Sequence, residues 1–219
     1  MRICGAIFDV DGTLLDSMST WDTIGETYLR SIGYEPKENL NEVFKNMSLR
    51  QAACYYQTEY GVTLGIEQIM DGVNAMLERY YRFEVPLKPG AAELLARLRE
   101  SGVKLCVATA TDRYLVEAAL ERCGVLSCFG EIFTCNEVGR GKDEPDIFEA
   151  ALSFLGTEKA KTVVFDDALY AVKTAKAAGF PVAAVYDRHE KNSEEIRALA
   201  DLYLEDLTQL DKLGSCFPA

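Results

Sequence analysis

The sequence is poor in histidine and in positive charge. Its 219 residues include one histidine, His189, although zinc sites and most acid–base catalytic sites depend on this residue. His189 stands in the polar run DRHEKNSEE, which predicts a solvated loop. Lys and Arg number 23 against 35 Asp and Glu, a formal net charge of −12. Because nucleic acids and anionic membrane surfaces are bound mainly through Lys and Arg, we expect neither as a partner.

Long apolar runs and closely paired cysteines are also missing. No stretch approaches the roughly 20 consecutive apolar residues that cross a bilayer, and the strand-like run after Arg2 argues against a signal peptide. The cysteines are Cys4, Cys54, Cys106, Cys123, Cys128, Cys135 and Cys216. They form no CxxC pair, so we interpret them as reduced thiols of a cytoplasmic protein rather than as a disulfide framework or a metal site.

Four short apolar runs are typical of buried strands. They are ICGAIFDVDGT, VKLCVATAT, KTVVFDDA and PVAAVYD. Amphipathic helical patterns that close at Gly102, Gly124 and Gly179 lie after residue 90, and EIFTC and ADLYLE are two weaker candidate strands. Near-continuous apolar strands alternating with helices predict an α/β fold, a parallel sheet covered on both faces.

The region from 17 to 86 has a different pattern, with apolar residues at helical spacing and no convincing strand. We therefore expect two domains: an α/β core made of residues 1–16 and 87–219, and an all-helical insertion made of residues 17–86. The stretch PLKPG, which begins at Pro86, is interpreted as the return hinge.

Acidic and hydroxyl side chains follow the predicted strands at their carboxyl ends, where open parallel sheets bind ligands. Asp9 and Asp11 follow the first run, and Asp166 and Asp167 end the third. Thr109 and Thr111 end the second run. If these strands are neighbours, one crevice gathers four carboxylates, and a hard divalent cation would stabilise them. Mg²⁺ suits such oxygen ligands together with a substrate phosphate.

Lys142 supplies a cation to this crevice. It lies in the glycine-rich run GRGKDEPDIF, ahead of a helix that we expect to begin near Pro145. The combination predicts phosphoryl transfer through an aspartyl-phosphate: Asp9 attacks phosphorus, and Asp11 protonates the leaving oxygen and later takes a proton from water. Gly12 and Thr13 allow the sharp turn that presents backbone N–H groups to the phosphate.

These residues resemble the motifs of the haloacid dehalogenase superfamily over nearly the whole chain. The family's DxDGT motif is complete from Asp9 to Thr13, and its strand-ending Ser or Thr is similar to Thr109. Its lysine loop, written GKPxPDxF, resembles GKDEPDIF with Lys142. Its acidic motif after an apolar strand is similar to Asp166-Asp167.

The resemblance implies a Rossmann-like core, Mg²⁺ as cofactor and a small phosphorylated metabolite as substrate. It implies that Asp9 and Asp167 ligate the metal through their carboxylates and Asp11 through its main-chain carbonyl, with Asp166 either a further ligand or a water-mediated neighbour. Thr109, Ala110 and Lys142 would bind the phosphate. The insertion is similar to the cap domain of phosphoglycolate phosphatases and β-phosphoglucomutases, in which cap residues choose the substrate.

Three features qualify the resemblance. Asp143 replaces the usual proline after the lysine. The β-phosphoglucomutases carry a histidine in the first cap helix, and here Trp21 falls near that place, which disfavours the alternative of a phosphosugar mutase. Dehalogenases lack the second acid of DxD, because a halide leaves without a proton. The presence of Asp11 therefore favours phosphate over halide chemistry.

Substrate recognition is open at this level. Arg50 is the best candidate in the insertion for a cation that binds the substrate, and a place on a solvated helix face is the equal alternative. Trp21 either stacks on the substrate or packs in the core of its helix bundle. Phosphoglycolate, sugar phosphates and nucleotide monophosphates all stay open, as does the oligomeric state. A phospho-aspartate receiver module and an idle binding protein are further alternatives, and both fit the long insertion and the complete motifs less well.

Overall fold

The computed structural model describes residues 3–44, 47, 49–209 and 211–212. The chain divides into two compact units: a core unit, Met1–Asp16 with Val85–Ala219, and a helical unit, Ser17–Glu84. The second unit is continuous in sequence and interrupts the first after Asp16. Its proposed role as a cap stays a prediction.

A six-stranded parallel sheet forms the centre of the core unit, in the order β3-β2-β1-β4-β5-β6. The strands are β1 (Gly5–Phe8), β2 (Lys104–Thr109), β3 (Ile132–Thr134), β4 (Thr162–Asp166), β5 (Val182–Val185) and β6 (Leu202–Leu204). They match the four strong and two weaker runs, so the predicted α/β class is confirmed. The chain builds outward from β1 in both directions, which places a topological switch point between β1 and β4.

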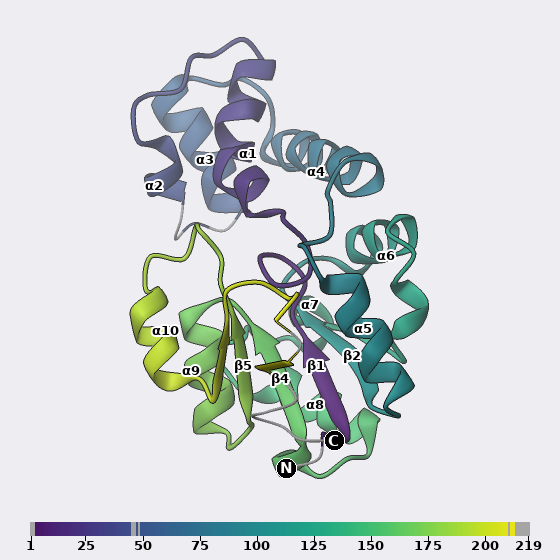
Figure 1. Cartoon of the computed structure of the whole chain (residues 1–219). Helices are drawn as coiled ribbons and strands as arrows, with labels where there is room; N and C mark the ends of the chain where they lie inside the picture. The colour runs from purple at the N-terminus through teal and green to yellow at the C-terminus, as the bar shows by residue number, and fades with distance from the viewer. Residues whose placement is uncertain (1–2, 45–46, 48, 210, 213–219) are drawn as a thin grey trace. The chain divides into compact units, whose positions relative to one another are not determined.

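Helices connect the strands of the core unit. They are α5 (Ala91–Glu100), α6 (Arg113–Arg122), α7 (Cys135–Val138), α8 (Asp146–Leu155), α9 (Leu169–Ala177) and α10 (Ser193–Leu199), with short 3₁₀ turns at Leu126–Cys128 and Lys159–Lys161. Right-handed crossovers put α5 and α6 on one face of the sheet and α8 to α10 on the other, as Figure 1 shows. The helix expected near Pro145 is α8, which begins directly after that proline.

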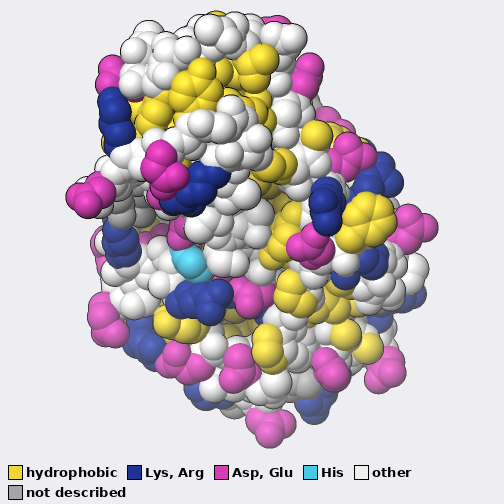
Figure 2. Space-filling model, turned by 90° about the horizontal axis from the view of Figure 1, so that it is seen from above, with side chains coloured by type: hydrophobic (Ala, Val, Ile, Leu, Met, Phe, Trp, Pro, Cys, Tyr) yellow, Lys and Arg dark blue, Asp and Glu magenta, His cyan; other side chains and the backbone are white. Residues whose placement is uncertain are grey.

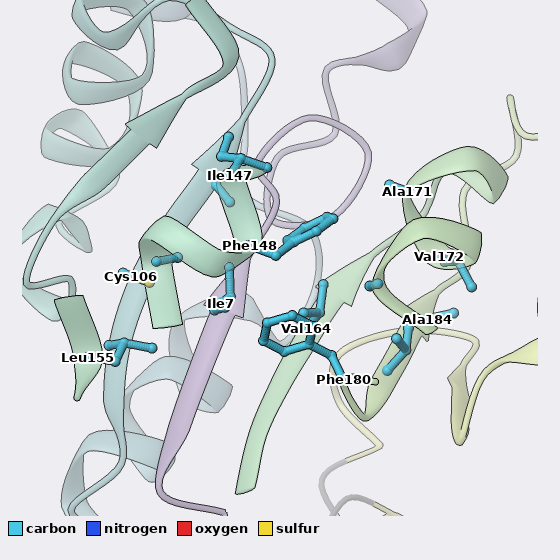
Figure 3. Packing of buried hydrophobic residues seen from close by; sticks show 14 of the residues in the cluster. Ile7, Cys106, Ile147, Phe148, Leu155, Val164, Ala171, Val172, Phe180 and Ala184 are labelled. Atoms are coloured by element: carbon cyan, nitrogen blue, oxygen red, sulfur yellow. The ribbon is translucent and has the colours of Figure 1, made fainter. Parts of the chain in front are cut away.

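Alternate strand residues meet helices on each face of the sheet. Ile7, Cys106 and Val164 are paired in register across β1, β2 and β4, and they pack under α8 and α9 (Figure 3). On the opposite face Phe8 stacks on Phe165, with ring centroids 4.3 Å apart. These buried side chains are among the most apolar in the chain, so hydrophobic burial fixes the register and, with it, the residue at which each strand ends.

The helical unit contains α1 (Met18–Ser31), α2 (Leu40–Phe44), α3 (Leu49–Tyr60) and α4 (Ile66–Phe83). Tyrosines fill much of its centre. The Tyr56 hydroxyl donates to the Gly25 carbonyl at 2.6 Å, and the Tyr28 ring lies so close to Gly72 that a Cβ there would be 2.4 Å from it. The lack of a Cβ at Gly72 therefore lets α4 accept the Tyr28 ring.

The surface carries both signs of charge. Figure 2 shows Lys and Arg side chains interspersed with Asp and Glu over the face that it presents. Across the described residues, no helix is both long and apolar enough to span a bilayer. None of the six cysteines in the described ranges forms a disulfide, and Cys216 lies outside those ranges.

The packing around α8 predicts a large effect of truncating Phe148. This side chain is fully buried, with its ring 6.2 Å from that of Phe180, so Phe148→Ala should lower the free energy of unfolding by about 3–5 kcal/mol. Phe154→Ala on the same helix removes a ring that is 50% exposed and should cost about 1 kcal/mol or less. Urea denaturation measures both, and equal losses would contradict the assignment of the core.

Candidate active site

Three carboxylates converge where β1 and β4 end side by side. Asp9 directly follows β1 and continues the ladder, with its N–H donating to the Phe165 carbonyl at 2.9 Å. Asp166 ends β4 and Asp167 follows it. One oxygen from each of the three carboxylates lies within 4.8 Å of the others, and all three side chains are buried. The sheet therefore brings together residues more than 150 positions apart.

Lys142 lies inside this acidic group. It belongs to the loop between α7 and α8, it is 3% exposed, and its Nζ donates to Asp9 Oδ1 and, at 2.8 Å, to Asp166 Oδ2. Burial alone would lower the pKa of Lys142, but the carboxylates of Asp166 and Asp9 outweigh it and raise this pKa above its ordinary value. Lys142 is therefore a permanent cation shared by two acids.

One ammonium does not compensate three carboxylates. Burial raises the pKa of Asp9 to about 7, with Lys142 opposing the shift and Asp166 and Asp11 adding to it. Burial, followed by the charges of Asp9 and Asp166, also raises the pKa of Asp167 well above its usual value. Burial therefore favours the protonated forms of Asp9 and Asp167, and a bound divalent cation would favour their ionised forms. A hard cation with oxygen ligands fits this donor set.

The loop after β1 wraps around Asp167. Gly12 has a φ of +81°, and a Cβ at this position would lie 2.3 Å from Asp167 Oδ2. The fully buried Thr13 donates its hydroxyl to Asp167 Oδ1 at 2.8 Å. The sequence pattern predicted a turn at both residues, but it did not predict the contact of Thr13 with the acidic group. The DxDGT segment thus shapes two sides of the site at once.

The two threonines at the end of β2 have different partners. Thr109 is fully buried, and its Oγ1 accepts a hydrogen bond from the Thr111 N–H at 3.1 Å. The Thr111 hydroxyl donates to Asp11 Oδ2 at 2.6 Å. Ala110 between them is exposed at the strand end. The phosphate role of Thr109 and Ala110 stays a prediction, and Thr111 is a site neighbour that the motif pattern alone left without a role.

Asp166 is anchored through both carboxylate oxygens. Its Oδ2 accepts from Lys142, and its Oδ1 accepts the Ala168 N–H at 3.0 Å. Asp143, the residue in place of the usual proline, is exposed, and its Oδ1 lies so near Gly141 that a Cβ there would be 2.5 Å away. Asp143 therefore turns toward its own loop.

Arg50 and Trp21 both belong to the helical unit. Arg50 in α3 is largely exposed and is ion-paired with Glu67 at the start of α4. The Trp21 indole N–H donates to the hydroxyl of the buried Tyr81 at 2.8 Å. This contact ties Trp21 into the packing of its own unit, and the substrate roles of both residues stay predictions.

The raised pKa of Asp9 predicts how pH affects stability in EDTA. Because the folded protein binds this proton more tightly than the unfolded chain does, the contribution is full below about pH 4 and is lost as the pH rises through about 7. The unfolding free energy of the wild type relative to Asp9→Asn should therefore fall by about 4 kcal/mol across this window. Urea denaturation at a series of pH values measures it, and a difference independent of pH would contradict the assignment.

Two curated phosphatases are similar to the chain over nearly its whole length. The chain is 28% identical over 205 residues to validoxylamine A 7′-phosphate phosphatase of Streptomyces hygroscopicus subsp. limoneus, covering 94% of each chain. It is 25% identical to hexitol phosphatase B of Escherichia coli strain K12, over 97% of this chain and 98% of that protein. The predicted class of enzyme, a phosphoric monoester hydrolase, is confirmed by these relatives.

The fold and the family are shown independently. A crystal structure of a putative β-phosphoglucomutase from Thermotoga maritima superposes with a TM-score of 0.84, covering 98% of this chain and 99% of that one at 23% identity, which shows the shared fold. The family model described as haloacid dehalogenase-like hydrolase matches residues 6–185. The match includes every motif residue named above, and the chain therefore belongs to the haloacid dehalogenase-like hydrolase family.

Proposed function

We propose that the protein is a Mg²⁺-dependent phosphatase that hydrolyses a small phosphomonoester through a phosphorylated Asp9. The observation that carries the proposal is the buried group of Asp9, Asp166 and Asp167 around Lys142. A carboxylate beside an ammonium, in a site that favours a divalent cation, is an arrangement that can accept a phosphoryl group.

Asp9 acts first. One of its carboxylate oxygens attacks phosphorus, and the bond between phosphorus and the ester oxygen breaks as the phosphoryl group moves to Asp9. Lys142 reduces the repulsion between this carboxylate and the phosphate, because its Nζ already donates to Asp9. Bound Mg²⁺ supplies further screening of the two anions. Thr109 and Ala110 hold the phosphate oxygens from the end of β2.

Asp11 moves the proton in both halves of the reaction. It donates a proton to the leaving alcohol oxygen, and then it accepts one from the water that attacks phosphorus and releases inorganic phosphate from Asp9. The Thr111 hydroxyl donates to Asp11 Oδ2 at 2.6 Å and so restricts the rotation of this carboxyl group. We infer that Thr111 holds the orientation of this acid.

Asp9, Asp167 and the main-chain carbonyl of Asp11 are the residues that would hold Mg²⁺. Asp167 is fixed from one side by the Thr13 hydroxyl. Asp166 uses one oxygen for Lys142 and the other for the Ala168 N–H, which favours a role in anchoring Lys142 over direct ligation.

The substrate that we favour is a phosphate ester of a sugar or a similar polyol. The support is the names of the two relatives, validoxylamine A 7′-phosphate phosphatase and hexitol phosphatase B. We propose the helical unit as the cap that selects the substrate, with Arg50 as its candidate cation. The six cysteines without a disulfide favour a cytoplasmic location.

A phosphosugar mutase is the second candidate. It uses the same aspartyl-phosphate chemistry, and the Thermotoga maritima structure shows only that the fold is compatible with it. The absence of histidine from residues 16–21 disfavours it. Product analysis on hexose phosphates separates the two: a phosphatase releases inorganic phosphate and free sugar, and a mutase releases an isomeric sugar phosphate.

Asp9→Asn should abolish turnover of p-nitrophenyl phosphate, by about 10⁴-fold or more, because the amide cannot act as the nucleophile. EDTA should do the same to the wild type, and Mg²⁺ should restore it. Asp211→Asn makes the same chemical change at an exposed position and should leave turnover unchanged. Turnover that survives both Asp9→Asn and EDTA would reject the mechanism.

Asp11→Asn should show the role of the leaving group's proton. The loss in kcat/KM should be about 10²–10⁴-fold for an alkyl phosphate, and much smaller for p-nitrophenyl phosphate, whose leaving group is stable without a proton. Steady-state kinetics on both esters measures the two losses. Equal losses would mean that Asp11 does not protonate the leaving oxygen.

A further inference from the structure

The core unit contains a second lysine with little exposure to solvent, outside the acidic group. Lys88 lies in the segment that returns from the helical unit, just before α5. Its Nζ donates to Asp187 Oδ2 at 2.7 Å and to the Tyr186 carbonyl at 2.9 Å. The two side chains are 12% and 2% exposed. A buried ion pair rarely stabilises a fold more than apolar residues of similar size do. The Lys88–Asp187 pair is therefore of interest mainly because it holds two segments in a fixed geometry.

The backbone of Lys88 binds the loop that follows β1. Its N–H donates to the Leu14 carbonyl at 2.8 Å, and Leu15 and Leu87 form an antiparallel bridge beside it. Leu14 directly follows Thr13, whose hydroxyl donates to Asp167. One neighbour of Asp167 is therefore held in place by the Lys88 main chain.

The side chain of Lys88 binds the loop 186–190, which follows β5. Asp187 Oδ1 accepts the His189 N–H at 2.8 Å and closes this loop into a turn. Glu190 Oε2 accepts a hydrogen bond from the Leu169 N–H at 3.3 Å. Leu169 is the first residue of α9 and lies two residues after Asp167. The loop thus reaches the other side of Asp167.

We propose that the Lys88–Asp187 pair positions Asp167 for the divalent cation, and that Lys88 is a positioning residue of the site. Both segments that flank Asp167 are bound by Lys88, one through its main chain and one through its side chain. The inference rests on the cation site of the proposed function and does not depend on the substrate.

The test uses the double variant Lys88→Met/Asp187→Asn, with Mg²⁺ alone as the probe. The double change keeps the net charge and leaves no unpaired buried ion, so the fold should be retained. The asparagine Oδ1 can still accept from the His189 N–H. Thermal unfolding at increasing Mg²⁺ reports binding to the folded state without any assay of activity. The Mg²⁺ dissociation constant, fitted from the rise of Tm with Mg²⁺ concentration, should increase by about 10–100-fold.

The matched control is Lys173→Met/Glu195→Gln, which removes an ion pair between α9 and α10 whose side chains are each 51% exposed. It should leave the Mg²⁺ dependence unchanged. Asp187→Asn alone keeps the contact of Lys88 with the Tyr186 carbonyl, so it should show a smaller rise in the same direction. This single variant carries the test if the double variant does not fold.

An unchanged Mg²⁺ dependence in these variants would overturn the inference and leave the phosphatase proposal intact. A wild type that Mg²⁺ does not stabilise would overturn both. A wild type that binds Mg²⁺ with the predicted dependence on Lys88, but hydrolyses no phosphate ester, would support the positioning role and reject the phosphatase.

Discussion

Mutual repulsion among buried carboxylates is the constraint on which the site depends. Two like charges separated by the 4.8 Å that bounds the oxygens of Asp9, Asp166 and Asp167 repel by about 3–4 kcal/mol at an effective dielectric constant near 20. Lys142 offsets part of this repulsion, while burial, followed by the charges of the neighbouring carboxylates, raises the pKa values of Asp9 and Asp167. A site that needs one more cation to ionise fully can bind a metal ion and a phosphate together.

The parallel sheet produces this constraint through its order of strands. β1 and β4 are neighbours, so the residues that follow them share one edge, and hydrophobic burial of Phe8 and Phe165 fixes where both strands end. The turn at Gly12 then brings the chain back against Asp167, at a distance that only a residue without Cβ allows. The free energy of hydrophobic packing thus holds the carboxylates of Asp9, Asp166 and Asp167 close together in spite of their mutual repulsion.

The local pattern of the sequence predicted the strands, their order of appearance and the acids at their ends, because apolar runs and turn residues are local signals. The family resemblance added the order of motifs. Neither could predict that Thr13 binds Asp167, that Thr111 binds Asp11 or that Lys88 binds Asp187, since these partners are 154, 100 and 99 residues apart. No periodicity encodes such pairs, and they depend on which strands become neighbours. Arg50 is a further example, because nothing in the local pattern around a single cation on a helix indicates that Glu67 is its partner.

The proposed function depends on the phosphorylation of Asp9 itself. Mixing the protein with a phosphate ester and Mg²⁺, quenching with acid within the first turnovers and analysing the peptides by mass spectrometry tests it directly. We expect one added phosphoryl group, labile to hydroxylamine, on the peptide that contains Asp9. Phosphate release without any phosphorylated peptide, or a phosphoryl group on another residue, would contradict it.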